Sequence, residues 1–473
     1  MRRPTLIIMS CIGFILGILL GYYYRFDISN WWLVFLVLTF ASIFIVSKNL
    51  KFIPSFLMML ALAIAVMTSR INYISQNGIS DKLFVKSLIT GAVVGDPYWD
   101  KDRNYVFTIS DLKIDGKPMA ESIKIKTFSS AVKEGNIVRA EGKIYPSLAK
   151  PGYVLSYAKV SVINNSQPVL VQAKNLLYKG VDTSIGGEPG NFIKGILVGA
   201  RTSLSQDLQD TLNSTGLSHV VAVSGYNLTI LVVVLQKLLR KKWAWGALVL
   251  SLTLVWGFTL LTGGSASIMR AAIMASVFLI ASYYGRPVSI FVCISLTAVL
   301  TLLLNPMALT EDIGWQLSFL SLTGIVVLVP VIQKVLPKKP VMLFEIIAIT
   351  LAAQIATIPY VLYVFGNYSI LAFVANTLLM PFIPLLMALG FLVSILGLVF
   401  PNTSVLIGGL VARVINYIFD FLKYLESQEA FRVTSSPSLI AVAIWYLCIV
   451  FIGLIVYNRG ISSSFQKHQE LVK

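Results

Sequence analysis

Long apolar runs separated by short polar loops dominate the chain on both sides of one polar stretch. Apolar runs of about 20 residues have the length of a transmembrane helix. We expect about eleven spans. The runs of this length are 5–24, 31–47 and 54–69 before the polar stretch, and 220–239, 243–262, 266–284, 288–304, 313–333, 341–365, 370–400, 405–426 and 438–457 after it.

The run at 370–400 is too long for one straight span. Pro381 and Pro384 interrupt it, and proline removes a helical hydrogen bond. We therefore expect a broken helix or a re-entrant pair in this region.

The polar stretch at 70–189 has the pattern of β-structure. Short runs of β-forming residues, some of them strictly alternating, are closed by turns rich in Gly, Pro and Asp. Five short strands favour a small barrel such as an OB-fold. The predicted strands are 88–94, 105–112, 122–128, 135–144 and 154–163. The helical periodicity of 192–215 then predicts a helix lying along the membrane surface.

The sequence thus predicts an α-helical polytopic membrane protein with an inserted, extracytoplasmic, OB-like β-barrel domain. Its expected parts are N-terminal transmembrane helices at 1–69, the OB-like domain at 70–170, an amphipathic interfacial linker at 171–218, a transmembrane domain at 219–458, and a cytoplasmic tail at 459–473.

Composition supports this class. Hydrophobic residues make up 56% of the 473 residues and charged residues 12%, which excludes a soluble protein of this size. The net charge is +17, and basic residues fall on alternating connections between the spans. The positive-inside rule assigns those connections and the C-terminus to the cytoplasm, and it assigns the polar stretch to the outside of the cytoplasmic membrane.

Several kinds of enzyme are excluded by the residues. There are only two histidines, and no HExxH motif, no Walker loop and no GxSxG elbow. The cysteines, Cys11, Cys293 and Cys448, lie in separate apolar runs, as free thiols in helices do. We expect no enzymatic activity, no metal and no cofactor.

Polar residues inside the apolar runs are the main candidates for function, because polar groups in a membrane usually face the bundle interior or water. They could also be packing devices that bond a helix carbonyl or bridge two helices. For Arg270 the alternative is snorkelling to the interface. The candidates are His219, Ser224, Asn227, Ser267, Arg270, Gln316, Ser318, Gln354 and Asn376.

Two further polar groupings leave alternatives open. Aromatic and basic residues interleave in the polar stretch, as binding of single-stranded nucleic acid requires, but a barrel core and solvated strands would also use them. These candidates are Trp99, Arg103, Tyr105, Lys124, Lys126, Arg139 and Lys143. A polar stripe of Arg413, Asn416, Asp420 and Lys423 could line a pore or face water from an interfacial helix.

The order of these motifs resembles the ComEC family of competence proteins, the membrane channels for incoming DNA. Six segments are similar to successive family blocks: 135–145, 195–201, 216–225, 267–271, 314–319 and 359–381. The resemblance implies transport of single-stranded DNA across the cytoplasmic membrane. It also implies cooperation with other competence proteins, among them a DNA receptor, a separate nuclease and a cytoplasmic motor, and it allows a homo-oligomer.

Two departures from the family pattern narrow this expectation. Asn227 stands where many relatives have a second histidine, and no metallo-β-lactamase-like segment follows the last span. Another protein must then degrade a DNA strand if one is degraded. One alternative function is a secondary transporter or exporter of a small or lipidic anion, with an external binding domain. Another is a degenerate assembly subunit with no transport of its own.

Overall fold

The structure is a computed structural model. It describes residues 3–24, 53–79, 82–100, 103–119, 121–128, 132–146, 152–164, 168–200, 203–221, 225, 227–228, 232, 244–286, 289–335, 342–428 and 431–458. The predicted span at 31–47 lies outside these residues, and the predicted span at 220–239 is described only in part.

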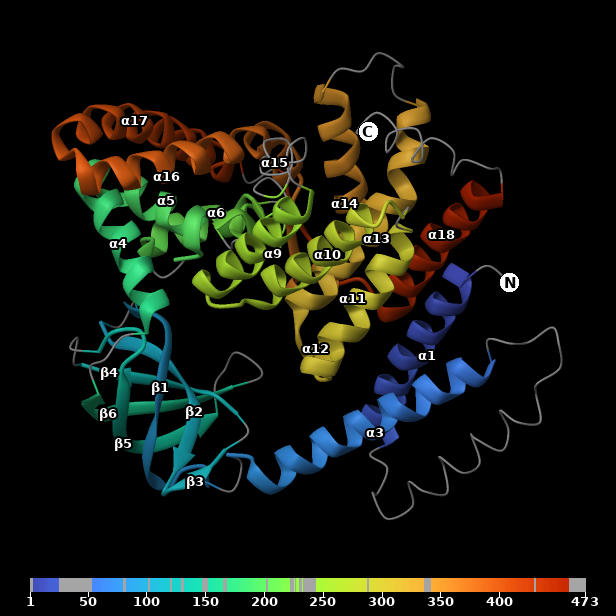
Figure 1. Ribbon diagram of the computed structural model, residues 1–473, viewed down its shortest axis with the longest axis horizontal. Coiled ribbons are helices and arrows are strands. Elements are labelled where there is room, and N and C mark those ends of the chain that lie inside the picture. The colour runs from blue at the N-terminus through green and yellow to red at the C-terminus, as the bar shows by residue number, and fades with distance from the viewer. Residues whose placement is uncertain are drawn as a thin grey trace. The chain divides into compact units, whose positions relative to one another are not determined.

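The chain forms two compact units that alternate along the sequence. One unit contains Met1–Lys179, Val198–Ser203 and Ser224–Ile313. The other contains Gly180–Leu197, Leu204–Val223 and Gly314–Lys473. Most elements in both are helices, and the first unit also holds a β-sheet domain (Figure 1).

Within the described part of the chain, 7 helical segments are long and apolar enough to cross a membrane. They are Leu6–Tyr23, Ser55–Ser75, Ala266–Tyr283, Ile313–Gln333, Phe344–Phe365, Leu371–Val399 and Pro401–Glu426. Trp245–Leu261, Ile290–Leu304 and Leu439–Ile452 are shorter apolar helices. The predicted count of about eleven spans stays a prediction.

The first unit begins with a pair of closely packed helices, α1 (Arg3–Tyr24) and α3 (Ile53–Asn77). Gly13, Gly17 and Gly21 recur every fourth residue on the face of α1 that meets α3. A Cβ on Gly21 would lie 2.9 Å from the Cβ of Met67, so only glycine permits this approach. Small residues of this spacing allow close contact between membrane helices.

The sheet domain confirms the predicted strands at 88–94, 105–112, 122–128, 135–144 and 154–163. The observed strands are β1 (Lys86–Trp99), β2 (Tyr105–Ile114), β3 (Lys117–Pro118), β4 (Ile123–Thr127), β5 (Ile137–Pro146) and β6 (Tyr153–Asn164). The two-residue strand β3 was not predicted. Along β4 the alternation has its expected effect, because Ile123, Ile125 and Thr127 are buried while Lys124 points outward.

The strands pair in the order β1-β5-β6-β4-β2-β3, and β1 also pairs with β2. The β4–β6 pairing is parallel, and the other pairings are antiparallel. Aliphatic side chains from the long strands, such as Ile89, Ile109, Ile125, Val138 and Leu155, form one buried cluster between them. The OB-like barrel itself stays a prediction and is considered below.

Helix α4 (Val169–Ser184) begins directly after the sheet domain and is fixed to it by charge. The Nζ atom of Lys174 lies 3.0 Å from Oδ1 of Asp96 and also contacts a carboxylate oxygen of Glu134. The Tyr178 hydroxyl donates a hydrogen bond of 2.9 Å to Oδ2 of Asp96. Only 8% of the Lys174 side chain is exposed. We call Lys174, Asp96, Glu134 and Tyr178 the α4 anchor.

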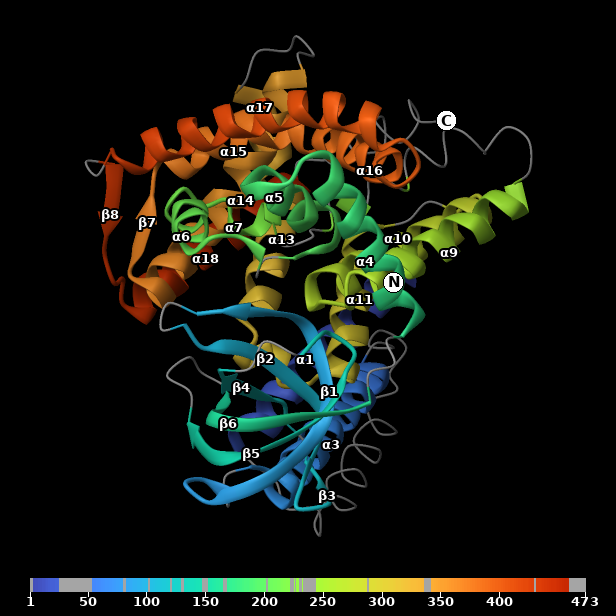
Figure 2. The ribbon, with the colours of Figure 1, turned by 90° about the vertical axis from the view of Figure 1, so that its left-hand side faces the viewer.

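The first unit continues with α9 (Ala244–Leu261), α10 (Ala266–Tyr283), α11 (Ile290–Leu304) and α12 (Ala308–Glu311). Helices α9 and α10 lie side by side as a hairpin in both views (Figures 1 and 2). Leu228 and Val232 pack against them in a buried cluster that includes Val255, Ala272 and Leu279. The described residues of the predicted span at 220–239 therefore contribute to this bundle.

The second unit contains the long helices α13 (Ile313–Val335), α14 (Met342–Phe365) and α18 (Leu439–Asn458). The Tyr446 hydroxyl donates 2.9 Å to the carbonyl of Ala356, which ties α18 to α14. The short strands β7 (Asn367–Ser369) and β8 (Arg432–Thr434) pair next to them. Here the predicted interruption at 370–400 is confirmed, because α15 (Leu371–Leu379) and α16 (Ile383–Val399) are separated by the 3₁₀ turn η4 (Met380–Phe382).

The remaining helices of the second unit are α5 (Gly187–Val198), α6 (Gln206–Ser214), α7 (Ser218–Val221) and α17 (Pro401–Glu426). Helices α16 and α17 lie side by side in both views (Figures 1 and 2). The end of α4 packs against both through small residues, because a Cβ on Gly397 would meet the carbonyl of Gly180 and one on Gly408 would meet the carbonyl of Ser184.

The prediction of one continuous helix over 192–215 is wrong. Helix α5 ends at Val198, and Gly199 follows with φ +83, a left-handed conformation that ends helices. A new helix, α6, begins after Ser205, whose Oγ accepts a hydrogen bond of 3.3 Å from the backbone N–H of Leu208.

Candidate functional site

Three candidates lie in the first unit, close to the start of α10. A Cβ on Gly225 would lie 2.9 Å from the Cβ of Ala271, so a glycine is needed where this segment meets α10. Two residues after Gly225, the side chain of Asn227 is 2% exposed, and Arg270 is 4% exposed. Ser267 is half-buried one turn before Arg270. The candidates Asn227 and Arg270 therefore belong to segments in direct contact.

Arg270 is the most heavily buried arginine among the described residues of the apolar helices. It lies in the second turn of α10. The carboxylate of Asp312, next to the end of α12, exerts an attractive electrostatic force on it. A buried guanidinium can offer positive charge to an anion inside the helical bundle.

A second polar group lies in the other unit and includes Asn376. Gly216 has φ +70, and a Cβ on it would lie 2.7 Å from the Cβ of Ala372 and 4.0 Å from Nδ2 of Asn376. Asn376 is 7% exposed, and its Nδ2 donates 2.7 Å to the carbonyl of Ala372. Gly216, the first residue of the motif at 216–225, therefore lies close to Asn376.

His219 lies on the short helix α7 and is exposed. Its Nδ1 is 3.1 Å from the carbonyl oxygen of Gly216. The candidate Ser224 lies outside the described residues. The structure thus gives His219 a local backbone contact.

Gln316, Ser318 and Gln354 are half-buried on the helix pair α13–α14 of the second unit. The Tyr360 hydroxyl donates a short hydrogen bond to Oε1 of Gln316, which links the two helices. Gly324 lets α14 approach α13, because a Cβ there would lie 3.0 Å from the carbonyl oxygen of Ala352. The bond to Tyr360 is what we expect if Gln316 is a packing residue that bridges two helices. A role of Gln316 in transport stays a prediction.

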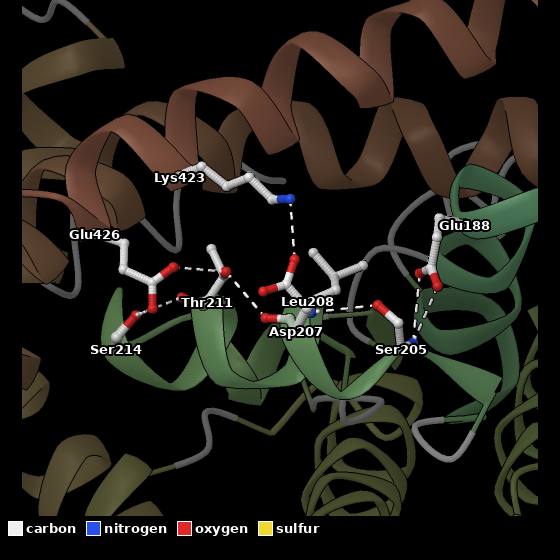
Figure 3. Close-up of polar contacts among 8 residues, drawn as sticks. All are labelled: Glu188, Ser205, Asp207, Leu208, Thr211, Ser214, Lys423 and Glu426. Atoms are coloured by element: carbon white, nitrogen blue, oxygen red, sulfur yellow. Dashed lines mark hydrogen bonds and ion pairs between the residues drawn. The ribbon is translucent and has the colours of Figure 1, made fainter. Parts of the chain in front are cut away.

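The sequence did not predict a set of polar contacts between α6 and the end of α17. Glu426 accepts hydrogen bonds from the hydroxyls of Thr211 at 2.6 Å and Ser214 at 3.0 Å (Figure 3). Nζ of Lys423 lies 3.0 Å from Oδ2 of Asp207. Lys423 of the predicted polar stripe thus points toward α6 (Figure 3). The signal in the sequence was the run of hydroxyls one turn apart on α6.

The candidates in the sheet domain divide into bonded and exposed residues. Tyr105 donates 3.1 Å to the carbonyl of Val132, and Nζ of Lys126 lies 2.8 Å from Oδ2 of Asp100. These contacts hold both side chains in the domain. The other candidates are exposed at the surface: Trp99, Arg103, Lys124, Arg139 and Lys143.

The pKa of Asp100, at this end of the domain, is shifted by its surroundings. Burial acts to raise the pKa of Asp100, but hydrogen bonds from Lys126 and Asn104 outweigh it. The pKa of Asp100 therefore lies below its ordinary value, and the Asp100–Lys126 pair is ionised at neutral pH.

An exposed aromatic surface lies at the same end of the domain and was only partly predicted. The rings of Trp99 and Tyr105 are 5.0 Å apart, and those of Phe128 and Tyr157 are 6.0 Å apart. Tyr105 pairs with Thr127, the neighbour of Phe128, so both ring pairs lie at one end of β2 and β4. Phe128 is 66% exposed and Tyr157 is 76% exposed. Tyr157 was missed because nothing in its strand pattern marks it as exposed.

No group of three or more His, Cys, Asp or Glu side chains among the described residues could hold a metal ion. Cys11 and Cys293 are buried free thiols, and Cys448 is an exposed one.

These observations define a multi-pass α-helical membrane protein with an inserted β-sheet domain. The family model described as competence protein matches residues 196–459, more than half of the chain. The chain therefore belongs to the competence protein family. The match covers the helices that hold Asn227, Arg270, Gln316 and Asn376.

A curated relative supports the same family. ComE operon protein 3 of Bacillus subtilis (strain 168) is 27% identical over 239 residues, which is 48% of this chain and 30% of that protein. The alignment thus spans less than a third of the relative's length. No solved structure matches the chain.

Proposed function

We propose that this protein is a membrane channel that carries single-stranded DNA across the cytoplasmic membrane during DNA uptake. One observation carries the proposal: the competence protein match covers helices in which Arg270, Asn227 and Asn376 are buried polar groups. Such groups are costly in a membrane, and their usual place is beside a polar pathway.

In this proposal the sheet domain is an OB-like barrel that receives the strand outside the membrane. The pairings support it, because β1 pairs with both β2 and β5, and β4 and β6 pair in parallel. This arrangement leaves each of these strands bonded on two sides. The exposed rings of Trp99, Phe128 and Tyr157 would stack on bases, and Lys124, Arg139 and Lys143 would contact phosphates.

The transmembrane part would then provide a wet, electropositive path. Phosphate is strongly hydrated, so conduction needs several weak contacts along the path and no single tight site. Arg270 would supply positive charge, and Asn227, Gln316 and Asn376 would replace part of the water around the strand. Ser267, Ser318, Gln354, His219 and Ser224 are further candidates for its lining.

Other proteins complete the proposed system. The proposed partners are a DNA receptor, a separate nuclease and a cytoplasmic motor that supplies the driving force, and the proposal allows a homo-oligomer. The proposed topology places the sheet domain at 70–170 outside and the tail at 459–473 in the cytoplasm, with the linker at 171–218 and the channel domain at 219–458. The alternation of basic loops in the sequence supports it.

The test is uptake of labelled DNA by a deletion strain that carries variants of the gene. We expect Arg270→Leu to reduce uptake about ten-fold or more, equivalent to about 1.4 kcal/mol, while its level in the membrane is unchanged. Arg270→Lys keeps the charge and should retain much of the activity. Arg432→Leu makes the same change at an exposed position of β8 and is the matched control. Normal uptake by the deletion strain or by Arg270→Leu contradicts the channel proposal.

A second candidate is a secondary transporter of a small or lipidic anion. The observation that favours it is the discontinuous helix α15–η4–α16, because broken helices often carry the substrate sites of transporters. Asn376 lies one turn before this break. Purified protein in vesicles distinguishes the two: a voltage that drives a labelled single-stranded oligonucleotide inward supports the channel, whereas movement of small anions alone supports the transporter.

A further inference from the structure

A groove on the last turns of α10 has no role in the path described above. It has a volume of about 470 Å³ and is lined by Val277, Ile280, Ala281, Tyr284 and Arg286. Val277, Ile280, Ala281 and Tyr284 follow one another at helical spacing and form one stripe. The groove thus has an apolar floor along the helix and one cationic side chain at its end.

The backbone fixes Arg286 at this end. Gly285 has φ +63 and donates its N–H to the carbonyl of Ser282 at 3.1 Å, and the N–H of Arg286 donates to the carbonyl of Ala281 at 2.9 Å. These two bonds form a Schellman motif, which turns the chain back on the last helical turn. The backbone of Arg286 is therefore held beside that of Ala281, and the Arg286 side chain is exposed.

Aromatic rings surround the same end of the helix pair. The ring of Trp245 at the start of α9 is 5.7 Å from that of Tyr283, and Tyr283 is 5.2 Å from Tyr284. Trp and Tyr gather at the level of lipid headgroups in membranes. In the sequence, Arg240, Lys241 and Lys242 precede Trp245 by three to five positions. The positive-inside rule assigns this basic end to the cytoplasm.

We propose that this groove binds one anionic phospholipid of the cytoplasmic leaflet. One acyl chain lies along Val277, Ile280 and Ala281, and the phosphate contacts Arg286. Charge complementarity carries the choice of occupant, because an apolar groove that ends at an exposed arginine matches a molecule with an apolar tail and an anionic head. Anionic lipids occur in the leaflet that faces basic loops of this kind. The proposal does not depend on transport of DNA.

The experiment is a lipid titration of the full chain in mild detergent, followed by native mass spectrometry. The probes are phosphatidylglycerol and phosphatidylcholine with the same acyl chains. We expect Arg286→Gln to raise the dissociation constant for phosphatidylglycerol about five-fold, which corresponds to about 1 kcal/mol for one basic residue near an anionic lipid. Arg432→Gln removes an exposed arginine from β8 and should leave it unchanged.

Two further variants keep the test decisive if Arg286→Gln fails to fold. Arg286→Lys retains the charge and should bind phosphatidylglycerol about as well as the wild type. Ala281→Phe fills the groove, retains the arginine and should weaken binding. Three results would each overturn the proposal. They are equal binding of the two lipids, a loss of phosphatidylglycerol binding with Arg432→Gln as large as that with Arg286→Gln, and complete competition by inorganic phosphate.

Discussion

The α4 anchor allows a buried ion pair to be compared with an exposed one in the same domain. Lys174→Met keeps most of the side chain's length and removes its charge. Asp96 and Glu134 then lose their shared cation, although their side chains are only 25% and 16% exposed. Removal of one partner from a buried pair costs about 3–5 kcal/mol, because the other charge stays buried.

The structure indicates the lower end of that range. Asp96 keeps the hydrogen bond from Tyr178 at 2.9 Å, and both carboxylates retain some contact with water. We therefore expect a loss of about 3 kcal/mol, which increases local opening about 100-fold. The effect should appear at β1, which carries Asp96, because α4 is fixed to this strand.

The assay is hydrogen exchange of the full chain in detergent at neutral pH, read on peptides from β1 and α4 by mass spectrometry. The matched control is Lys86→Met, which removes an exposed pair with Glu141 at 2.7 Å. The side chains of that pair are 67% and 46% exposed, so water screens the pair and its loss should change exchange little.

Two results would refute the reasoning. One is an equal change in exchange for Lys174→Met and Lys86→Met, since burial would then have no effect. The other is the absence of rescue in the double variant Lys174→Met with Glu134→Gln. Removing one of the buried carboxylate charges should recover part of the lost stability, because less charge is then left uncompensated.

Three other predictions test separate parts of the structure. Because the pKa of Asp100 is lowered, its ionised form stabilises the fold above about pH 4, and this contribution is lost as pH falls through the lowered pKa. Asp100→Asn should therefore flatten the dependence of the melting temperature on pH in acid. Gly408→Ala should cost about 1–3 kcal/mol in thermal unfolding because its Cβ meets the backbone of α4, whereas Gly409→Ala, with open space around it, should be neutral or slightly stabilising. Phe128→Ala should weaken binding of a labelled single-stranded oligonucleotide about ten-fold in fluorescence anisotropy, whereas Phe84→Ala at the opposite end of β1 should not. Equal losses in the two variants would contradict stacking of bases on Phe128.

The sequence predicted those elements that depend on local chemistry. The strands follow from alternation and turn residues, and the break at η4 follows from Pro381 and Pro384. The helix at 192–215 was wrong because one residue, Gly199 at φ +83, outweighs a periodic pattern on both sides of it.

The arrangement of the candidate residues depends on contacts between segments far apart in the sequence. The segments of Asn227 and Arg270 contact each other at Gly225 and Ala271. Asn376 belongs to the other unit, where it lies close to Gly216. No periodicity encodes these pairings. Glu426 illustrates the same limit, because its partners Thr211 and Ser214 lie more than 200 positions earlier in the chain.

The contact of Gly216 with α15 gives a last prediction, in which strain and crowding can be separated. Gly216→Ala should cost about 1–2 kcal/mol for the left-handed backbone and about 1–3 kcal/mol for contact with Ala372. Gly263→Ala, at φ +76 with open space, should show only the first cost in thermal unfolding. Ala372→Gly should then rescue part of the Gly216→Ala loss by removing the crowding. If the two alanine variants lose equal stability, the close approach to Asn376 does not require a glycine, and backbone conformation alone explains Gly216.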